Sequence, residues 1–345
     1  MASAATPEMD ARGEPPAFRE AIFAQAENLE SAASAARAAL AAADLAPLRS
    51  GVLVFSGIGA SWHALAPAVR RLRQDGRRAF AVSPQDLGHA PATALADAFV
   101  LVSQSGASAE LLAALERLDN GAVVVAISAA DGPMARAADV WLPLGKLPDT
   151  PVATLSYTAT LQALGLLCEA LLDSEPRADW DSLPALVNRT LEDCDAQAQV
   201  TAGRLEAVQA LDAIGSGASV ASAGETALLA REGLRIPATG FETRQYLHGP
   251  LESAGPGLGC ILFGSGREPS LASSLDSYGA SVALVTDRPH EAGLDSNLFA
   301  IPRAPELAAP ILEILPVHLL LTHLAAARGL AIGELRRQQR DTKVA

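Results

Sequence analysis

The stretch Val100-Leu-Val-Ser-Gln-Ser-Gly106 has a counterpart 160 residues further along the chain, Cys260-Ile-Leu-Phe-Gly-Ser-Gly266. Each stretch is a short apolar run that ends in polar residues and a glycine, which is typical of a buried strand leading into a turn. Two more stretches recur in the same order at an offset of 158 residues: Leu53–Gly59 at Leu211–Gly217, and residues 123–128 at 281–286. Three landmarks in the same order, with nearly equal offsets, indicate an internal duplication.

Helical sequence separates the strand-like runs in the first half of the chain. The patterns predict two sets of elements: strands at 51–55, 98–102, 123–127 and 139–142, and helices at 61–72, 108–118 and 154–172. Short apolar strands that alternate with helices favour parallel βαβ units. The predicted fold class is therefore α/β, with two tandem three-layer α/β/α domains, each built on a mainly parallel sheet.

The length of 345 residues fits two domains, because a domain commonly has about 100–200 residues. The expected division along the chain is a disordered tail at 1–16, an N-terminal helix at 17–43, a first domain at 44–175, a helical linker at 176–204, a second domain at 205–328 and a C-terminal tail at 329–345. The longest apolar stretch, 307–324, contains two prolines, a glutamate and two histidines. It is therefore expected to be a buried helix and not a membrane span.

The charge and the cysteines limit the class of protein. Asp and Glu number 39 against 26 Lys and Arg, so the net charge is −13, which disfavours nucleic acid and anionic membranes as partners. Residues 1–16 lack an apolar leader, so no targeting segment is expected. The three cysteines form neither a disulfide framework nor a metal spacing, which favours a reduced cytoplasm. No metal and no cofactor are implied, and Gly57-Ile-Gly59 lacks the third glycine of a nicotinamide-binding fingerprint.

Three hydroxyls and an amide follow the strand expected at 98–102, in the segment Ser103-Gln-Ser-Gly-Ala-Ser108. A strand–helix junction exposes backbone N–H groups that favour an anion, and hydroxyls add further donors. The alternative is a plain helix cap by Ser105 or Ser108, which explains only one of the hydroxyls. Ser61 follows another strand, and the carboxyl ends of parallel strands meet at one edge, so Ser61 is either a further donor to the same ligand or an N-cap.

Titratable residues suggest proton transfer in the second half of the chain. Glu225 and Glu232 are seven residues apart, which places them on one face of the helix expected at 221–234, and His248 lies in a turn beyond it. A carboxylate and a histidine are common proton carriers at neutral pH, but a solvated glutamate and a structural histidine are the alternatives. Lys343, one of only two lysines, belongs either to a frayed basic tail or to a segment folded over a site.

Together these motifs resemble the sugar isomerase (SIS) family in its tandem two-domain form, which includes the isomerase half of glucosamine-6-phosphate synthase. The resemblance covers almost the whole chain, and its most specific part is Ser103–Ser108. The other similar segments are 19–26, 139–144, 152–158, 224–232 and His248-Gly249-Pro250. Glu232 and His248 are 16 residues apart, as in that family's acid/base pair. The resemblance implies two flavodoxin-like SIS domains.

The resemblance also implies roles for individual residues. The implied phosphate-binding residues are Ser61, Ser103, Gln104, Ser105 and Ser108, and the other implied substrate contacts are Gly59, Val152 and Glu225. Glu232 would move a proton between C1 and C2, and His248 would assist ring opening in the neighbouring subunit's site. Lys343 matches the family lysine that forms an imine with a ketose. A homodimer is thereby implied.

The chain also departs from the synthase pattern. No N-terminal glutaminase domain is expected, because the residue directly after Met1 is Ala2 and not a catalytic cysteine. Leucines stand at two positions where the family often has lysine, Leu229 and Leu155. Glutamine-dependent amination is therefore not expected. The predicted function is that of a cytoplasmic phosphosugar isomerase or aminosugar-phosphate deaminase, acting on a hexose phosphate such as glucosamine 6-phosphate or fructose 6-phosphate. The alternatives are a deglycase of a phosphorylated sugar–amine adduct and a non-catalytic sugar-phosphate sensor.

Overall fold

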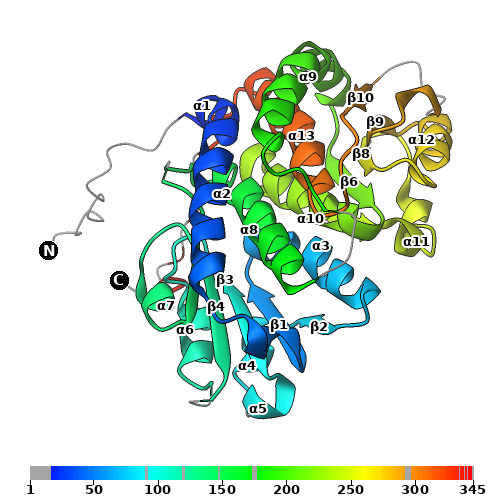
Figure 1. Cartoon of the computed structure of the whole chain (residues 1–345). Coiled ribbons are helices and arrows are strands. Elements are labelled where there is room, and N and C mark those ends of the chain that lie inside the picture. Colours follow the sequence, from blue (N-terminus) through cyan, green and yellow to red (C-terminus); the bar gives the residue numbers. More distant parts are fainter. Residues whose placement is uncertain are drawn as a thin grey trace, which may run out of the picture.

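Two five-stranded sheets organise the described part of the chain, and all their strand pairs are parallel (Figure 1). The structure is a computed structural model that describes residues 17–89, 92–118, 121–146, 148–172, 177–291, 297–333, 335–337, 339 and 341–343. The first sheet contains β1 (Val52–Gly57), β2 (Arg78–Ala81), β3 (Ala98–Val102), β4 (Val123–Ser128) and β5 (Val140–Pro143). The second contains β6 (Ala210–Gly215), β7 (Ala238–Glu242), β8 (Leu258–Phe263), β9 (Ser281–Thr286) and β10 (Leu298–Ala300).

The two sheets have the same topology. Their strand orders are β2-β1-β3-β4-β5 and β7-β6-β8-β9-β10, and each strand of the first sheet begins 158 or 160 residues before its counterpart in the second. The predicted fold class of two tandem α/β domains with parallel, flavodoxin-like sheets is therefore confirmed. The tail expected at 1–16 lies outside the described residues, and the exact domain boundaries stay a prediction.

Three strands have no counterpart in the sequence prediction: β2, β7 and β10. Each lies at an edge of its sheet and has a single buried residue, the others being partly or fully exposed. Such strands lack the continuous apolar run that marks β3 or β8, where every residue is buried. Their absence from the prediction therefore follows from their low burial, whereas β5, an edge strand with two buried residues, was predicted at 139–142.

The longer helices, apart from α12, lie where helical sequence was expected. They are α1 (Phe18–Phe23), α2 (Gln25–Ala42), α3 (Ala60–Gln74), α6 (Ala109–Leu115), α8 (Leu155–Leu171), α9 (Leu183–Leu205), α10 (Val220–Leu229), α12 (Glu268–Ser277) and α13 (Ala309–Ala327). Shorter helices are α4 (Pro84–Leu87), α5 (Ala92–Leu95), α7 (Pro133–Arg136) and α11 (Thr243–Tyr246), and 3-10 turns lie at Ala46–Arg49, Gly217–Ser219, Pro250–Ser253 and Pro289–Glu291. The single helix expected at 17–43 is divided into α1 and α2 at Ala24.

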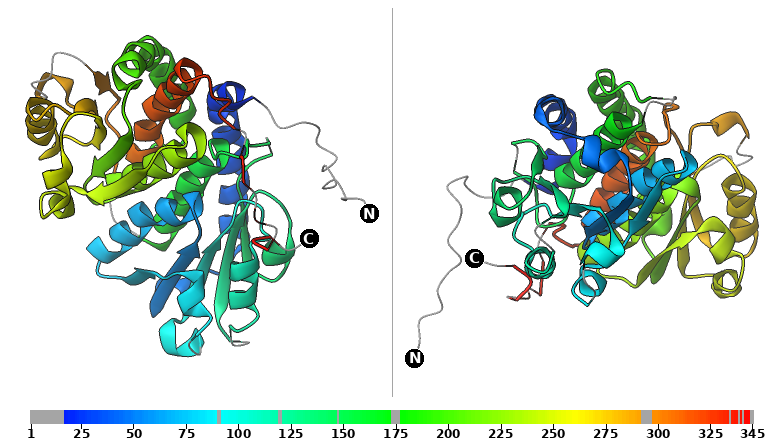
Figure 2. Two further views of the ribbon diagram at one scale, coloured as in Figure 1. Left: turned by 180° about the vertical axis from the view of Figure 1, so that it is seen from behind. Right: turned by 60° about the horizontal axis from the view of Figure 1, so that its bottom comes forward.

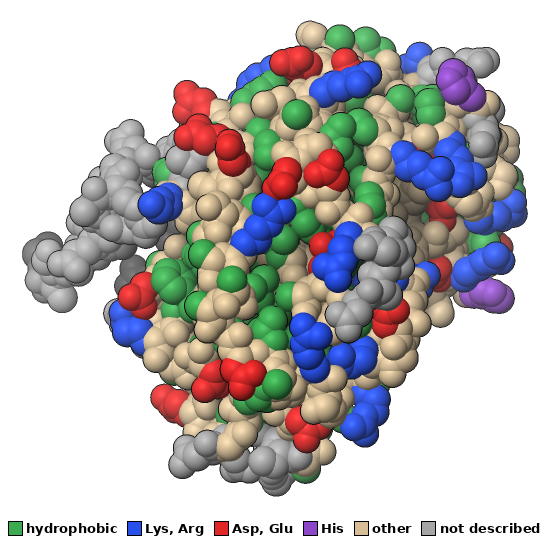
Figure 3. Space-filling view, in the orientation of Figure 1, with side chains coloured by type: hydrophobic (Ala, Val, Ile, Leu, Met, Phe, Trp, Pro, Cys, Tyr) green, Lys and Arg blue, Asp and Glu red, His purple; other side chains and the backbone are tan. Residues whose placement is uncertain are grey.

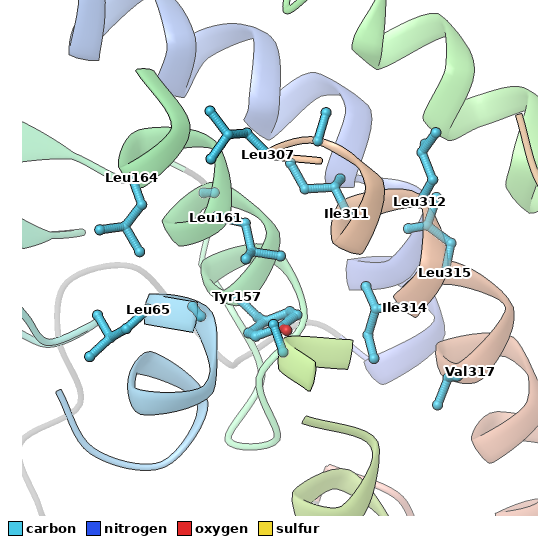
Figure 4. Packing of buried hydrophobic residues seen from close by; sticks show 14 of the residues in the cluster. Leu65, Tyr157, Leu161, Leu164, Leu307, Ile311, Leu312, Ile314, Leu315 and Val317 are labelled. Atoms are coloured by element: carbon cyan, nitrogen blue, oxygen red, sulfur yellow. The ribbon is translucent and has the colours of Figure 1, made fainter. Parts of the chain in front are cut away.

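One hydrophobic core joins the two domains. It contains buried side chains from α2, α3 and α8 beside the first sheet and from α9, α10 and α13 beside the second. Figure 4 shows part of it, with Tyr157 and Leu161 of α8 in the same cluster as Ile311 and Ile314 of α13. Smaller cores on the outer faces pack α6 and α7 against the first sheet and α11 and α12 against the second. Each sheet therefore lies between two layers of helices.

Helix α13 is long and apolar enough to cross a membrane by length and composition, but 78% of its most apolar window is buried inside the protein. It packs against α9 in the shared core, as expected for 307–324. Figure 3 shows acidic, basic and apolar side chains interspersed on one face of the molecule. Figure 2 shows the segment after α13, in red, returning from the second domain to the first.

Candidate active site

A cavity of about 290 Å³ lies at the carboxyl ends of β1 and β3. These strands flank the point at which the strand order of the first sheet reverses, where open α/β sheets commonly bind ligands. Residues from distant parts of the chain line it together, and those discussed below are Ser61, Ser103, Ser108, Tyr157, Glu232 and Lys343. Gly59, Gln104 and Ser105 also line this cavity, so eight of the predicted site residues meet there.

The loop after β3 supplies the hydroxyl groups of the cavity. The Oγ atoms of Ser103 and Ser108 are hydrogen-bonded at 2.8 Å, and the Ala107 N–H donates to Ser105 Oγ at 3.3 Å. Gly106 has φ +66°, a left-handed conformation that suits glycine. Ser108 is the N-cap of α6, but its side chain makes no capping hydrogen bond. Helix capping therefore does not explain the Ser108 hydroxyl, which favours a ligand-binding loop.

Ser61 enters the same cavity from the start of α3. The N-cap of this helix is Gly59, at φ 60° and ψ −128°, a region that residues with a Cβ atom rarely adopt. Ser61 lies two positions further along, inside the first turn, so it is not the N-cap that the alternative interpretation supposed. Gly59 thus sets the turn that brings Ser61 to the cavity.

The C-terminal segment reaches the cavity and pairs with the hydroxyl loop. Lys343 forms an antiparallel bridge with Ser108, and the Ala109 N–H donates to the Thr342 carbonyl at 3.1 Å. That bond satisfies one of the N–H groups at the start of α6, which sequence analysis assigned to an anion. Lys343 itself lines the cavity, whereas Lys146, the other lysine, is exposed and does not line it.

Glu232 lies in a π-helical turn, Ala230–Leu234, that follows α10. Such turns are rare and occur often at functional sites. The carboxyl group is partly buried, and this burial raises the pKa of Glu232 to about 7. Because of this raised pKa, Glu232 can exchange a proton near neutral pH. The π-helical turn ends at Arg235 in the left-handed conformation, which costs roughly 1–2 kcal/mol for a residue other than glycine.

Glu225 and Val152 lie behind the cavity wall and do not line it. Glu225 is completely buried, and neither of its carboxyl oxygens has a hydrogen-bond partner among the described residues. Burial, followed by the negative charges of Glu232 and Asp149, raises the pKa of Glu225 well above its ordinary value. Val152 is also completely buried, and its carbonyl accepts a hydrogen bond from Thr150 Oγ1. The predicted substrate contacts of both residues stay predictions.

His248 lies away from the cavity. It is exposed after α11, and its backbone N–H donates to the Gln245 carbonyl at 3.1 Å. The single chain therefore does not bring His248 to Glu232, and its contribution to a neighbouring subunit stays a prediction.

Close packing fixes α10, the helix that leads to Glu232. A Cβ atom on Gly224 would lie 2.3 Å from Nδ1 of His63 on α3, and one on Gly240 of β7 would lie 2.8 Å from the Gly224 Cα. Only residues without a side chain fit these two contacts. Helix α10 is thus held between α3 of the first domain and β7 of its own domain.

The start of α8 forms a cavity wall whose role sequence analysis missed. Asp149 accepts hydrogen bonds from the backbone and hydroxyl groups of Thr154 and Ser156, which holds the first turn of the helix. Ser156, Tyr157 and Thr160 line the cavity from this helix. Their signal in the sequence is a run of hydroxyl residues within an otherwise apolar helix. The described residues contain no group of three or more His, Cys, Asp or Glu that could hold a metal.

No protein-family model matches the chain. Over 248 residues it is 32% identical to the glutamine–fructose-6-phosphate aminotransferase of Thermococcus kodakarensis, in an alignment that covers 67% of this chain and 41% of that protein. The chain spans less than half the length of the curated relatives compared with it. The match therefore does not show that this chain has the activity of those whole proteins.

Solved structures with similar folds cover nearly the whole chain. The C-terminal domain of glucosamine-fructose-6-phosphate aminotransferase from Francisella tularensis has a TM-score of 0.79 at 17% identity, covering 94% of this chain and 99% of that one. Glucosamine-6-phosphate deaminase from Thermotoga maritima has a TM-score of 0.76 at 18% identity, covering 95% and 99%. At these identities the similarity establishes the fold.

Proposed function

We propose, from the premise that this chain belongs to the tandem sugar isomerase (SIS) family by homology and by fold, that it is an enzyme acting on a hexose 6-phosphate. The observation that carries the proposal is one cavity that contains a loop of hydroxyl groups, a carboxyl group able to exchange protons at neutral pH, and an amine. These are the groups that binding a phosphate and moving a proton require.

The hydroxyl groups act as the phosphate-binding end of the site. The five proposed phosphate ligands are Ser61, Ser103, Gln104, Ser105 and Ser108, all of which line the cavity. Neutral donors hold a phosphate without a positive field, which suits a chain of net charge −13. Lys343 contributes the cation or the imine-forming amine at the same loop.

Glu232 acts at the other end of the substrate, where it moves a proton between C1 and C2. A general acid/base works best when its pKa is near the operating pH, and burial raises the pKa of Glu232 to about 7. With glucosamine 6-phosphate, transfer of the proton from C2 to C1 turns the amine into a C2 imine. Water then hydrolyses the imine to fructose 6-phosphate and ammonia, with no oxidation or reduction. His248 assists ring opening from the second subunit of a homodimer.

The setting of the enzyme is a reducing cytoplasm. Burial raises the pKa of the thiols of Cys168, Cys194 and Cys260 to about 12, so all three are unreactive packing residues. Three buried cysteines without disulfide bonds support a reducing compartment. The deamination itself needs no nitrogen from glutamine.

The test is turnover of glucosamine 6-phosphate and fructose 6-phosphate by the purified chain, read as ammonia release and as interconversion of ketose and aldose. Glu232→Gln should lower kcat by at least about 100-fold. It should leave thermal stabilisation by the sugar phosphate in place, because the phosphate ligands are retained. Glu192→Gln, an exposed glutamate on α9, is the matched control.

Two results would contradict the proposal. If the Glu232→Gln variant had the kcat of the wild type, Glu232 would have no part in the reaction. Thermal stabilisation by several sugar phosphates, without turnover of any of them, would instead indicate a non-catalytic sensor.

A further inference from the structure

A cluster of charged side chains from three helices holds the N-terminal helix α1 in place. Arg19 of α1 donates to both carboxyl oxygens of Asp195 on α9, at 3.3 and 2.6 Å. Nε2 of His323 on α13 lies 2.9 Å from one of the same oxygens. Asp195 thus joins α1 to α9 and α13 of the second domain. The function proposed above gives this cluster no role.

The cluster has the geometry in which a surface ion pair is strong. An isolated exposed pair contributes little to stability, but a bidentate pair within a network can contribute more. The exposed fractions of the side chains are 42% for Arg19, 32% for Asp195 and 23% for His323, so water screens the cluster only in part. Hydrogen bonds from Arg19, and to a smaller extent from His323, hold the pKa of Asp195 below its ordinary value. The cluster therefore fixes α1 on α9 and α13.

Helix α1 also packs against the C-terminal segment, just after this segment leaves α13. Phe18 is buried, and its ring meets the ring of His318 edge to face, with the ring centroids 6.3 Å apart. A Cβ atom on Gly333 would lie 3.8 Å from the Phe18 Cβ atom, which is van der Waals contact. Figure 2 shows the segment after α13, in red, passing α1, in dark blue. Helix α1 therefore forms one wall of the path that the C-terminal segment follows.

The other wall of this path is the π-helical turn that contains Glu232. A Cβ atom on Gly233 would lie 2.8 Å from Cδ1 of Ile332, so the Ile332 side chain occupies the space that a larger residue at 233 would need. Ile332 also packs against the shared core. Residues 332 and 333 thus lie between α1 and the turn. Because Gly233 directly follows Glu232, a movement of this segment changes the surroundings of the Glu232 carboxyl group.

We infer that the Arg19–Asp195 pair positions Glu232 by holding α1 and the C-terminal segment against the π-helical turn. The inference rests on the proposed function, in which Glu232 carries the proton. Arg19 and Asp195 are positioning residues, because neither lines the cavity. When the pair is broken, the C-terminal segment loses the support of α1, and water gains access to the Glu232 carboxyl group. The hydroxyl loop has its own contacts with Thr342 and Lys343, so phosphate binding should be retained.

The test is a double-mutant cycle of Arg19→Ala and Asp195→Ala in the whole chain. Its first readout is the pKa of Glu232, measured by carbon-13 NMR of glutamate-labelled protein, with Glu232→Gln to identify the resonance. In each single variant this pKa should fall from about 7 toward the ordinary value of 4.5, because the carboxyl group gains water. The double variant should show no larger fall than either single variant, since the two residues act as one pair.

The second readout is steady-state kinetics with the sugar phosphates named above. The kcat of each single variant should fall about tenfold while KM stays within about twofold, because the carboxyl group is displaced but the phosphate ligands are kept. Arg37→Ala is the matched control: it removes an exposed ion pair between α2 and Asp181, and it should change neither kcat nor the pKa of Glu232.

Three results would overturn the inference: a pKa of Glu232 that is the same in both variants as in the wild type, a lowered pKa with the kcat of the wild type, or an equal change in the Arg37→Ala control. The NMR readout needs no turnover, so it separates the inference from the proposed function. The expected fall in pKa without turnover by the wild type would reject the proposed function alone. Turnover with an unchanged pKa would reject the positioning role alone.

Discussion

The two domains have equivalent strand-end loops, but acidic residues surround the loop of the second. In the first domain, Ser103 and Ser108 bond to each other at the end of β3. In the second, a cavity of about 240 Å³ at the ends of β6, β8 and β9 contains three acidic residues, Glu268, Asp287 and Glu313. The loop Gly264-Ser265-Gly266 there occupies the place of Gln104-Ser105-Gly106.

The donors of the second site bond to the chain's own carboxylates. The Gly266 N–H donates to Glu268 at 3.1 Å, and Thr243 Oγ1 donates to the other oxygen of Glu268 at 2.6 Å. Ser265 bonds to Asp287, and Ser219 donates to Glu313 at 2.7 Å. A phosphate would meet repulsion there. The duplicated fold thus retains the loop in both domains, but in the second the hydrogen-bond donors are already occupied by carboxylates.

The largest expected difference between the two loops is in ligand binding, and it is tested by removing hydroxyl groups from one loop and then from the other. Ser103→Ala with Ser108→Ala should weaken the binding of fructose 6-phosphate roughly a hundredfold, because two hydrogen bonds to a charged group are lost. Ser265→Ala with Thr286→Val removes a hydroxyl pair at the strand ends of the second domain, which is also bonded at 2.8 Å. That variant should bind the ligand as the wild type does, by calorimetry. Equal losses in both would mean that the second site also binds the sugar phosphate.

The role of the carboxylates in the second domain is tested by measuring the free energy of unfolding. Glu268→Ala should lower the free energy of unfolding by about 2–3 kcal/mol, since the buried Thr243 hydroxyl and the Gly266 N–H lose their acceptor. Urea unfolding measures the change, with exposed Glu116→Ala as the control. An unchanged stability would show that the carboxylate is not a structural substitute for a ligand.

Gly224→Ala tests how the second domain serves the site of the first. The new methyl group would overlap the His63 ring, so α10 must shift, at a cost of about 1–3 kcal/mol. Because α10 leads to Glu232, kcat should fall more than the affinity for the phosphate, and steady-state kinetics separate the two. Gly203→Ala, a helical position with no neighbour within 4 Å of the added Cβ atom, is the control. Wild-type kcat in Gly224→Ala would contradict the proposed support of Glu232.

The smallest expected effect is a pH dependence of stability that arises from the first site. Burial raises the pKa of Glu232 from 4.5 to about 7, so the folded protein holds this proton more tightly than the unfolded chain. The stabilisation is complete below about pH 4.5 and is lost as pH rises toward 7. Relative to Glu232→Gln, the wild type should therefore lose stability over that range, by urea unfolding at several pH values. Parallel stability curves for the two proteins would exclude this titration.

The central strands and the main site motif were predictable because their signals are local. The run Ala98–Val102 is apolar throughout, and Ser103–Ser108 follows it directly. Residue type makes Glu232 and Lys343 candidates, the family resemblance gives them roles, and the structure places both in the lining of the cavity that contains the hydroxyl loop. The edge strands β2 and β7 have no such signal, because one side of each meets solvent.

The groove beside Glu232 that is lined by Arg231, Arg235, Arg336 and Arg337 could not be predicted, because its residues meet only in the folded chain. Arg231 and Arg336 are about a hundred residues apart, and the latter belongs to a basic stretch typical of a solvated tail. The complete burial of Glu225 and Val152 likewise depends on packing between helices that no periodicity specifies. The position of His248 relative to a second subunit requires an interface that a single sequence does not describe.

The shared core has a consequence for the way the chain unfolds and moves. One cluster of buried residues contains both Leu65 of α3 and Val317 of α13 (Figure 4), so neither domain can unfold without exposing apolar surface of the other. Heat should unfold both in one cooperative transition, and a ligand in the first cavity should slow amide hydrogen exchange in β8 as well as in β3. Since the described part of this core connects α3 and α8 of the first domain to α10 and α13 of the second, we expect the domains to move little relative to each other when a ligand binds.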